Sequence, residues 1–151
     1  MRKILNLLAL SLLLTGCNAC KSSPVIFGDK ADLSIFMNQM NSDLQKIGQP
    51  IITEKINYYV YRKELAPQQF KYEGYCSTVN GEKHISLSVD LNDIGVSDYL
   101  TFVHEIGHCI YNKKHDDSKP NIMTTNRHPD VFNQFKIESE RLRLIREMIN
   151  N

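Results

Sequence analysis

Apolar side chains recur every three or four residues between positions 29 and 47, with polar residues between them. This spacing places the apolar residues on one face of an amphipathic helix. Gly48 and Pro50 follow, and both residue types commonly mark the end of a helix. The pattern therefore predicts an N-terminal helix at residues 29–47. Its core-facing residues are Leu33, Phe36, Met40, Leu44 and Ile47.

The next stretches are rich in β-branched and aromatic residues. Residues 56–61 predict a strand that ends before a polar loop around Pro67. Residues 72–79 and 84–89 predict two further strands, and Asn80-Gly81 between them is a strong signal for a tight hairpin turn. The segment therefore predicts a β-hairpin. His84 begins the second strand, where we expect it to face solvent rather than to bind a metal.

A second helical pattern runs from Ser97 or Asp98, either of which is a suitable N-cap, to Tyr111. Gly107 inside a helix costs about 1 kcal/mol relative to Ala, so we expect another segment to pack closely against it. Asn112 then tolerates the left-handed conformation that ends helices, which allows the chain to turn back sharply. The predicted buried face consists of Leu100, Val103, Ile106, Gly107 and Ile110.

The last part of the chain contains a short apolar element and a terminal helix. Residues 120–123 form the apolar element, and residues 128–130, His-Pro-Asp, are typical of a helix start. The helix is expected to reach about residue 150, with His128 as a cap or pocket-lining residue. The order of helix, strands, hairpin and two more helices predicts a small α+β domain. The buried stripe of the terminal helix consists of Phe135, Leu142, Ile145 and Ile149.

The N-terminus has the features of a targeting segment. Arg2 and Lys3 precede an apolar run at residues 4–14 that is too short to span a bilayer, and residues 14–17 read Leu-Thr-Gly-Cys. This tetrapeptide resembles the lipobox of bacterial lipoproteins. The resemblance implies a signal peptide at residues 1–16, lipidation of Cys17 and a tether at residues 17–29, in which residues 25–27 could form an edge strand. The alternative is an ordinary secreted signal with an incidental cysteine.

A lipid anchor would hold the protein on a membrane outside the cytoplasm, with the outer membrane favoured. Removal of Arg2 and Lys3 from 18 basic residues leaves 16 against 17 acidic ones, so nothing indicates a nucleic-acid partner. The remaining residues, 30–151, suffice for one domain, which we expect to be monomeric. An oxidising compartment would permit a disulfide between Cys76 and Cys109, although two buried free thiols remain the alternative. Cys20 is interpreted as a tether residue rather than a thiolate that caps a metal.

The sequence His104-Glu105-Ile106-Gly107-His108 carries the most specific chemistry. On a helix, histidines four residues apart lie on one face and can share a metal ion. Neutral imidazoles suit Zn²⁺, and a catalytic zinc site uses three protein ligands so that the fourth position can hold water. Glu105 lies about 100° around the helix from His104, beside the metal, where it can act as general base.

Residues 99 to about 125 resemble the metzincin zinc endopeptidases, whose signature is His-Glu-x-x-His-x-x-Gly-x-x-His followed by a Met-turn. The resemblance implies that His115 is the third zinc ligand and that Met123 lies in the apolar floor beneath the metal. It also implies a zincin-like domain at residues 30–151 with a twisted sheet, an active-site helix, a Met-turn and a C-terminal helix. A family member would bind an extended peptide along the edge strand of this sheet.

The chain departs from the family at the turn. Six residues, 109–114, separate His108 from His115 where the family has five, and Tyr111 stands in place of Gly. Because Asn112 keeps the family's spacing to the third histidine, we expect a helix that is one residue longer and then turns at Asn112. One extra residue rotates the exit by about 100°. Asp116, and after it Glu138 or Glu140, therefore remain alternative third ligands.

These observations favour a membrane-anchored zinc endopeptidase that hydrolyses peptide bonds with a zinc-activated water and Glu105 as base. One alternative is a zinc-containing binding lipoprotein that does not cleave. The presence of Glu105 argues against it, because the ligands alone would suffice to hold zinc. Another alternative is a hydrolase of cell-wall peptides, which would use the same metal chemistry. The expected partners are a peptide or protein substrate and the membrane.

Overall fold

The computed structural model describes residues 28–61, 73–89, 94–126 and 128–151. Helices and strands occupy separate layers, and the α+β class predicted from the sequence is confirmed. Cys17, Cys20 and the candidate strand at residues 25–27 lie outside the described residues. Within the described ranges, no helix combines the length and apolar character that a membrane crossing requires.

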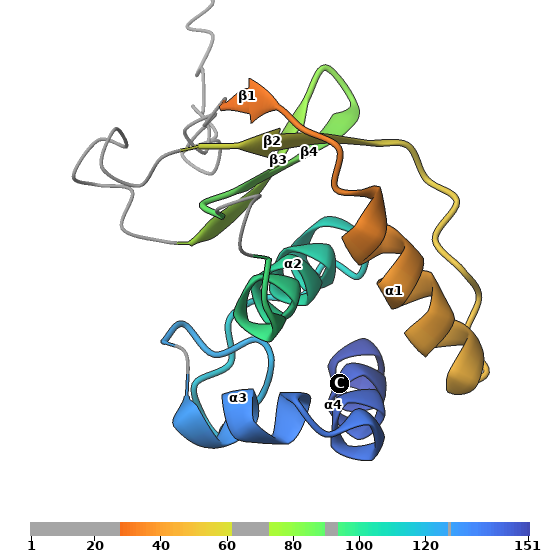
Figure 1. Ribbon diagram of the computed structural model, residues 1–151, viewed down its shortest axis with the longest axis vertical. Coiled ribbons are helices and arrows are strands. Elements are labelled where there is room, and N and C mark those ends of the chain that lie inside the picture. Colours follow the sequence, from red (N-terminus) through yellow and green to blue (C-terminus); the bar gives the residue numbers. More distant parts are fainter. Residues whose placement is uncertain (1–27, 62–72, 90–93, 127) are drawn as a thin grey trace, which may run out of the picture.

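The sheet has the strand order β1-β2-β4-β3 (Figure 1). Its strands are β1 (Asp29–Lys30), β2 (Ile56–Val60), β3 (Gly74–Val79) and β4 (Glu82–Leu87). β2 and β4 are parallel, whereas β1 and β3 pair antiparallel with their neighbours. Asn80 and Gly81 connect β3 to β4, and both have positive φ, at 51° and 81°. This is the backbone conformation for which Asn-Gly hairpin turns are selected.

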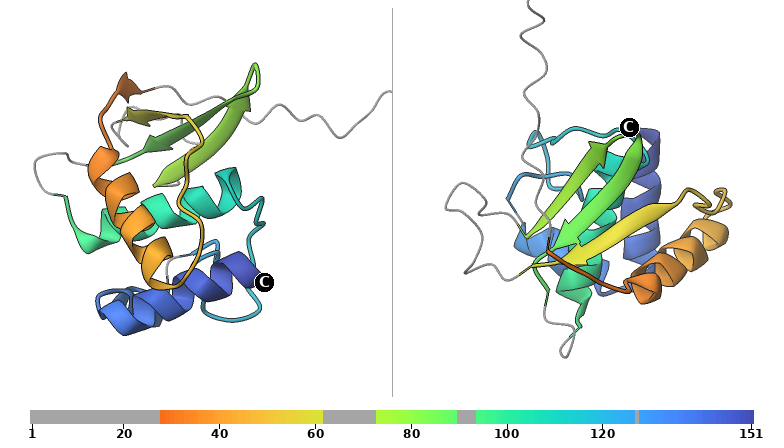
Figure 2. Two further views of the ribbon diagram at one scale, coloured as in Figure 1. Left: turned by 90° about the vertical axis from the view of Figure 1, so that its right-hand side faces the viewer. Right: turned by 90° about the horizontal axis from the view of Figure 1, so that it is seen from above.

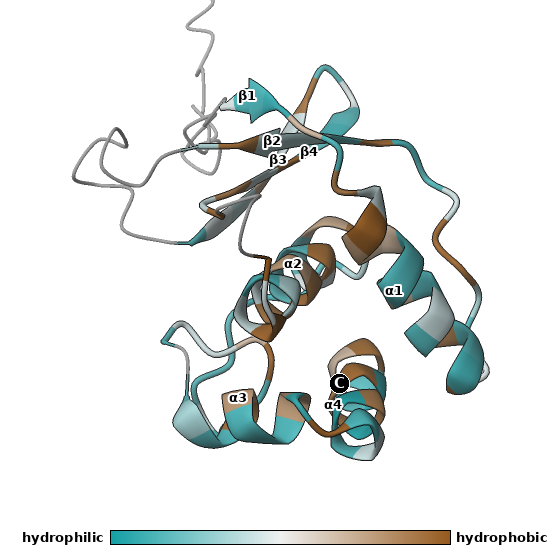
Figure 3. Ribbon diagram, viewed as in Figure 1, coloured by the Kyte–Doolittle hydropathy of each residue, from teal (hydrophilic) through white to brown (hydrophobic). Residues whose placement is uncertain are grey.

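Helix α2 (Val96–Cys109) lies at the centre of the molecule, beneath the sheet. Figure 2 shows the strands crossing above it, and α1 (Ser34–Lys46), α3 (Pro129–Phe135) and α4 (Glu138–Asn150) surround its remaining sides. The apolar colouring of α2 in Figure 3 reflects this burial. Phe102, Val103 and Ile106 are fully buried. The core therefore forms around α2, and His104 and His108 lie on a face of the helix that is only partly buried.

The predicted helices are present, but four details of the expectation are wrong. Residues 29–30 form β1 rather than the first turn of α1, because they pair with β2. Gly95, rather than Ser97 or Asp98, is the N-cap of α2, and the Asp98 carboxylate accepts a hydrogen bond from the Gly95 amide at 2.8 Å. The expected single terminal helix is two helices, because Ile137 has an extended backbone. Within α4, Leu144 and Met148 are buried while Leu142 is only half-buried.

His84 is also placed differently from the expectation. Its side chain is 7% exposed and stacks on the ring of Tyr59, with centroids 5.7 Å apart. The alternating pattern correctly put Ile85 and Leu87 on the core face. It did not reveal that the opposite face of β4 is also covered, which is why the solvent-facing prediction failed.

Two ion pairs join α1 to α4 and differ in burial. The fully buried carboxylate of Asp43 accepts hydrogen bonds from Arg141 Nε and the Tyr99 hydroxyl, each at 2.9 Å. Lys46 and Glu138 form the second pair at the surface. Removing one partner of a buried pair leaves an uncompensated charge, whereas an exposed pair is screened by water.

We therefore expect Arg141→Ala to lower the free energy of unfolding by about 3 kcal/mol. Lys46→Ala, which removes a cation from the same two helices, should leave it nearly unchanged. Urea unfolding of both variants followed by circular dichroism measures the difference. Equal losses in the two variants would show that burial of Asp43 does not govern this contact.

Candidate metal centre

The centre is built on the exposed stripe of α2. His104 and His108 are four residues apart, so their imidazoles project from the same face of the helix. Their Nε2 atoms are 3.1 Å apart. Both side chains are half-buried. The helix alone therefore supplies two adjacent nitrogen ligands.

The loop after α2 brings His115 back to this pair. Asn112 adopts positive φ, 52°, as its residue type predicted, and the Lys113 amide then donates to the Gly107 carbonyl at 2.9 Å. His115 Nε2 lies 3.2 Å from Nε2 of both His104 and His108. The turn at Asn112 thus compensates for the extra residue in the spacing.

Backbone carbonyls hold two of the rings from behind. The carbonyl oxygens of Ile122 and Lys113 accept hydrogen bonds from His104 Nδ1 and His108 Nδ1, both at 2.6 Å. Because Nδ1 carries the proton in each bond, Nε2 carries a lone pair. Burial lowers the pKa of His108, the Lys113 carbonyl opposes this, and neighbouring His115 adds to the lowering. A neutral imidazole with a free Nε2 is the form that binds metals.

The spacing of the three nitrogens fits a zinc ion. With zinc–nitrogen bonds of 2.0–2.1 Å, tetrahedral ligands stand about 3.3 Å apart. The observed separations are 3.1–3.2 Å. Three imidazole nitrogens at these distances could coordinate one cation placed between them. Within the described part of the chain, His104, His108 and His115 are the group able to hold a metal ion.

Met123 packs against α2 at Gly107. A Cβ atom added at Gly107 would come within 2.5 Å of Met123 Sδ and 3.1 Å of Met148 Sδ. Only Gly permits this close approach, which is the packing reason expected for a glycine inside the helix. The Met123 carbonyl accepts a hydrogen bond from the Asp116 amide at 3.0 Å. Met123 therefore links the segment after His115 to the surface of α2 at Gly107.

Glu105 points to the other side of α2, toward strand β3. Its side chain is 5% exposed, and the Cys76 amide donates a hydrogen bond to it. Burial raises the pKa of Glu105 to about 8, and the hydrogen bond from Cys76 partly opposes that shift. Gly74 leaves room for the carboxylate, because a Cβ there would lie 2.8 Å from both Cγ and Oε1 of Glu105.

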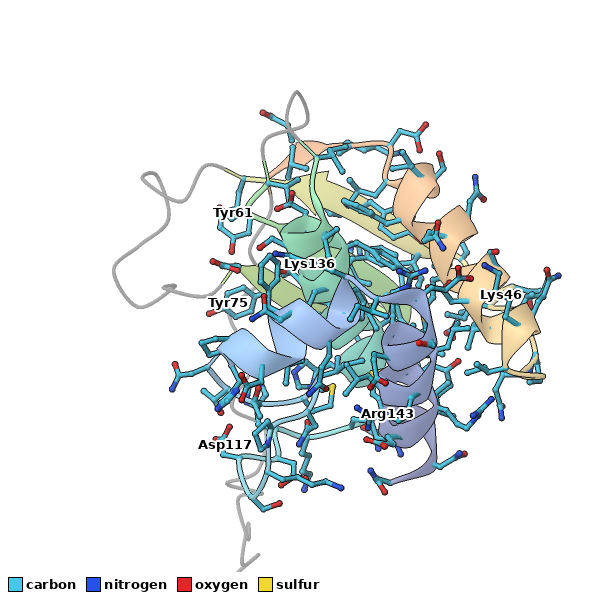
Figure 4. The ribbon with its side chains drawn as sticks, turned by 60° about the horizontal axis from the view of Figure 1, so that its bottom comes forward. Lys46, Tyr61, Tyr75, Asp117, Lys136 and Arg143 are labelled. Carbon is cyan, nitrogen blue, oxygen red and sulfur yellow. A yellow bond between two sulfur atoms is a disulfide. The ribbon has the colours of Figure 1, made fainter. Side chains whose placement is uncertain are left out.

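Tyr61 and Tyr75 lie on the same side of the molecule, and Lys46 lies on the opposite side (Figure 4). Burial, followed by the charges of Tyr75, Glu105 and Glu73, raises the pKa of Tyr61 above its usual value. Tyr61 is thus within electrostatic reach of Glu105. The sequence contained no spacing signal that linked Tyr61 or Gly74 to Glu105.

Cys76 and Cys109 form a disulfide, with Cα atoms 5.6 Å apart. The sequence left open a disulfide or two free thiols, and the structure has the disulfide. Cys109 follows a candidate ligand directly and lies at the end of α2, and Cys76 lies on β3. The bond therefore connects α2, which carries two of the candidate ligands, to β3 of the sheet.

The alternative ligands have other partners. The Asp116 carboxylate accepts hydrogen bonds from the Ser118 amide and hydroxyl, at 3.0 and 2.6 Å. Glu138 pairs with Lys46, and Glu140 pairs with Arg143. His128 caps α3 by accepting from the Asp130 amide, as its position before Pro129 suggested. These side chains do not join the three-histidine group.

Comparison with protein-family models, curated proteins and solved structures yields no match. The assignment of this centre therefore rests on the chemistry and geometry of its residues.

If His115 completes the site, His115→Ala should abolish tight zinc binding, because two histidines supply only half of a tetrahedral set. Asp116→Ala is the matched control from the same loop and should keep most of the affinity. Competition between the purified protein and a chromogenic chelator measures both. Retention of zinc by His115→Ala, with loss in Glu138→Ala or Glu140→Ala, would move the third ligand to α4.

Proposed function

We propose that this chain is a zinc-dependent endopeptidase that is anchored to a membrane through lipid on Cys17 and has a zincin-like, metzincin-type domain. The observation that carries the proposal is the convergence of three histidine Nε2 atoms at 3.1–3.2 Å, at a helix that also carries the buried Glu105. A structural zinc site closes its coordination with a fourth protein ligand, whereas a catalytic site keeps one position open. The group formed by described residues contains three ligands.

His104, His108 and His115 would hold the zinc ion. When bound in such a site, zinc polarises a substrate carbonyl and lowers the pKa of water. The carbonyls of Ile122 and Lys113 hold the rings of His104 and His108 in one orientation, so that Nε2 faces the centre. This preorganisation is the contribution of the protein to the ligand set.

Glu105 would accept a proton from the attacking water and pass it to the leaving amine. Its position one residue after His104 places it beside the ligands rather than among them. Burial raises the pKa of this carboxyl to about 8, and a cation bound at the neighbouring histidines would favour the ionised form that acts as a base. A glutamate held this way has no role in merely retaining a metal, which favours hydrolysis over simple zinc storage.

Replacement of Glu105 separates catalysis from metal binding. Glu105→Gln should retain one zinc per chain yet lose cleavage of casein by at least about a hundredfold, because the amide cannot take up the proton. Zinc analysis and the rate of casein cleavage by the full chain measure the two properties. Glu138→Gln removes a surface carboxylate from α4 and should leave both unchanged. Undiminished turnover in Glu105→Gln would exclude this mechanism.

The anchor makes a separate prediction. Expressed in a bacterium that processes lipoproteins, the wild-type chain should sediment with membranes in high salt, whereas Cys17→Ser should remain soluble. Cys20→Ser changes a nearby thiol and should still sediment. The distribution is measured by immunoblotting of both fractions. A Cys17→Ser variant that still sediments would refute lipidation at this residue.

A further inference from the structure

The two residues that directly follow ligands on α2 both face strand β3. Glu105 follows His104, and Cys109 follows His108. They are four residues apart, so they share one face of the helix, turned about 100° from the ligands. Glu105 contacts Gly74 and Cys76, and Cys109 is bonded to Cys76. Strand β3 therefore contacts α2 at both of the positions that directly follow a candidate ligand.

The direction of the β3 amides makes this contact possible. Among the described strands, β3 lies at the edge of the sheet and pairs with β4, and the Ser88 amide donates to the Glu73 carbonyl at 2.8 Å. In an antiparallel pair the hydrogen-bonded residues alternate, so residues 73, 75 and 77 face β4 while residues 74 and 76 direct their amides away from it. The Cys76 amide is thus available to the Glu105 carboxylate.

Resting on the function proposed above, we propose that the Cys76–Cys109 disulfide is a positioning element for Glu105. It fixes β3 on α2 so that the Cys76 amide and the backbone of Gly74 hold the Glu105 carboxylate in one position against the helix. The ligands themselves are held by a different set of contacts, the carbonyls of Ile122 and Lys113. Loss of the disulfide should therefore impair the base while sparing the metal.

The opposing interpretation is that the disulfide acts only on stability. Its partners are 33 residues apart, and a crosslink stabilises a protein by restricting the unfolded chain. A control that also loses stability is available in α1, where Leu44 is fully buried and its replacement by Ala leaves a cavity in the core. Leu44 lies outside the metal centre and its supporting contacts.

The experiment compares Cys76→Ser/Cys109→Ser with Leu44→Ala in the full chain, at a temperature where both are folded by circular dichroism. Zinc content, kcat and KM for a fluorogenic peptide, and hydrogen exchange of the residue 76 amide are measured. We expect the double variant to keep its zinc and its KM, to lose about 10- to 100-fold in kcat, and to exchange amide 76 at least about tenfold faster. Leu44→Ala should keep kcat and amide protection.

Gly74→Ala provides a second test with the disulfide intact. Its new methyl group would displace the Glu105 carboxylate, so kcat should fall while zinc content and stability change little. Thr78→Ala, an exposed position further along β3, is the matched control and should behave as wild type. A double variant or a Gly74→Ala variant with wild-type kcat would overturn the positioning role.

Hydrogen exchange keeps this inference separable from the proposed function. In a chain that binds zinc but cleaves nothing, the peptidase proposal fails. Even then, Glu105→Ala should deprotect amide 76, and removal of the disulfide should do the same. Unchanged protection of that amide in both variants would overturn the inference whatever the activity.

Discussion

The packing of α2 between the sheet and the other helices is the constraint on which the candidate centre depends. Phe102, Val103 and Ile106 are fully buried, so the helix cannot rotate without exposing core. Burial of an apolar side chain of this size contributes about 1.5–3 kcal/mol. The stripe that carries His104 and His108 is consequently held in one direction, and the rest of the centre is assembled around it.

Two separate sets of contacts hold the three histidines and Glu105. On one side, the loop after α2 supplies His115 and the carbonyls of Lys113 and Ile122, which orient the rings. On the other side, β3 contacts Glu105 in a buried site, where the Cys76 amide donates a hydrogen bond to the carboxylate. Since the two sides use different segments, each can be perturbed with the other left in place.

Glycine has a defined steric role on both sides of α2. At Gly107 it admits the sulfur atoms of Met123 and Met148 to the helix surface, and at Gly74 it admits the Glu105 carboxylate to β3. A methyl group at either position would require a neighbour to move. The loop and β3 can therefore approach α2 closely because Gly107 and Gly74 have no side chains. Large apolar residues form the hydrophobic cluster around α2.

Local chemistry in the sequence was sufficient for the helical pair His104 and His108, the left-handed turn at Asn112, the Asn80-Gly81 hairpin and the α+β class, because each depends on residues close in the chain. It left the third candidate ligand and the disulfide open, because both depend on segments far apart in the chain. His115 reaches His104 and His108 only when the loop packs on α2, and Cys76 reaches Cys109 only when β3 does. The sequence also missed the break at Ile137, the burial of His84 and the contacts of Glu105 with Gly74 and the Cys76 amide. Those features depend on which segment covers a given face, and hydrophobic periodicity records that a face is covered without recording what covers it.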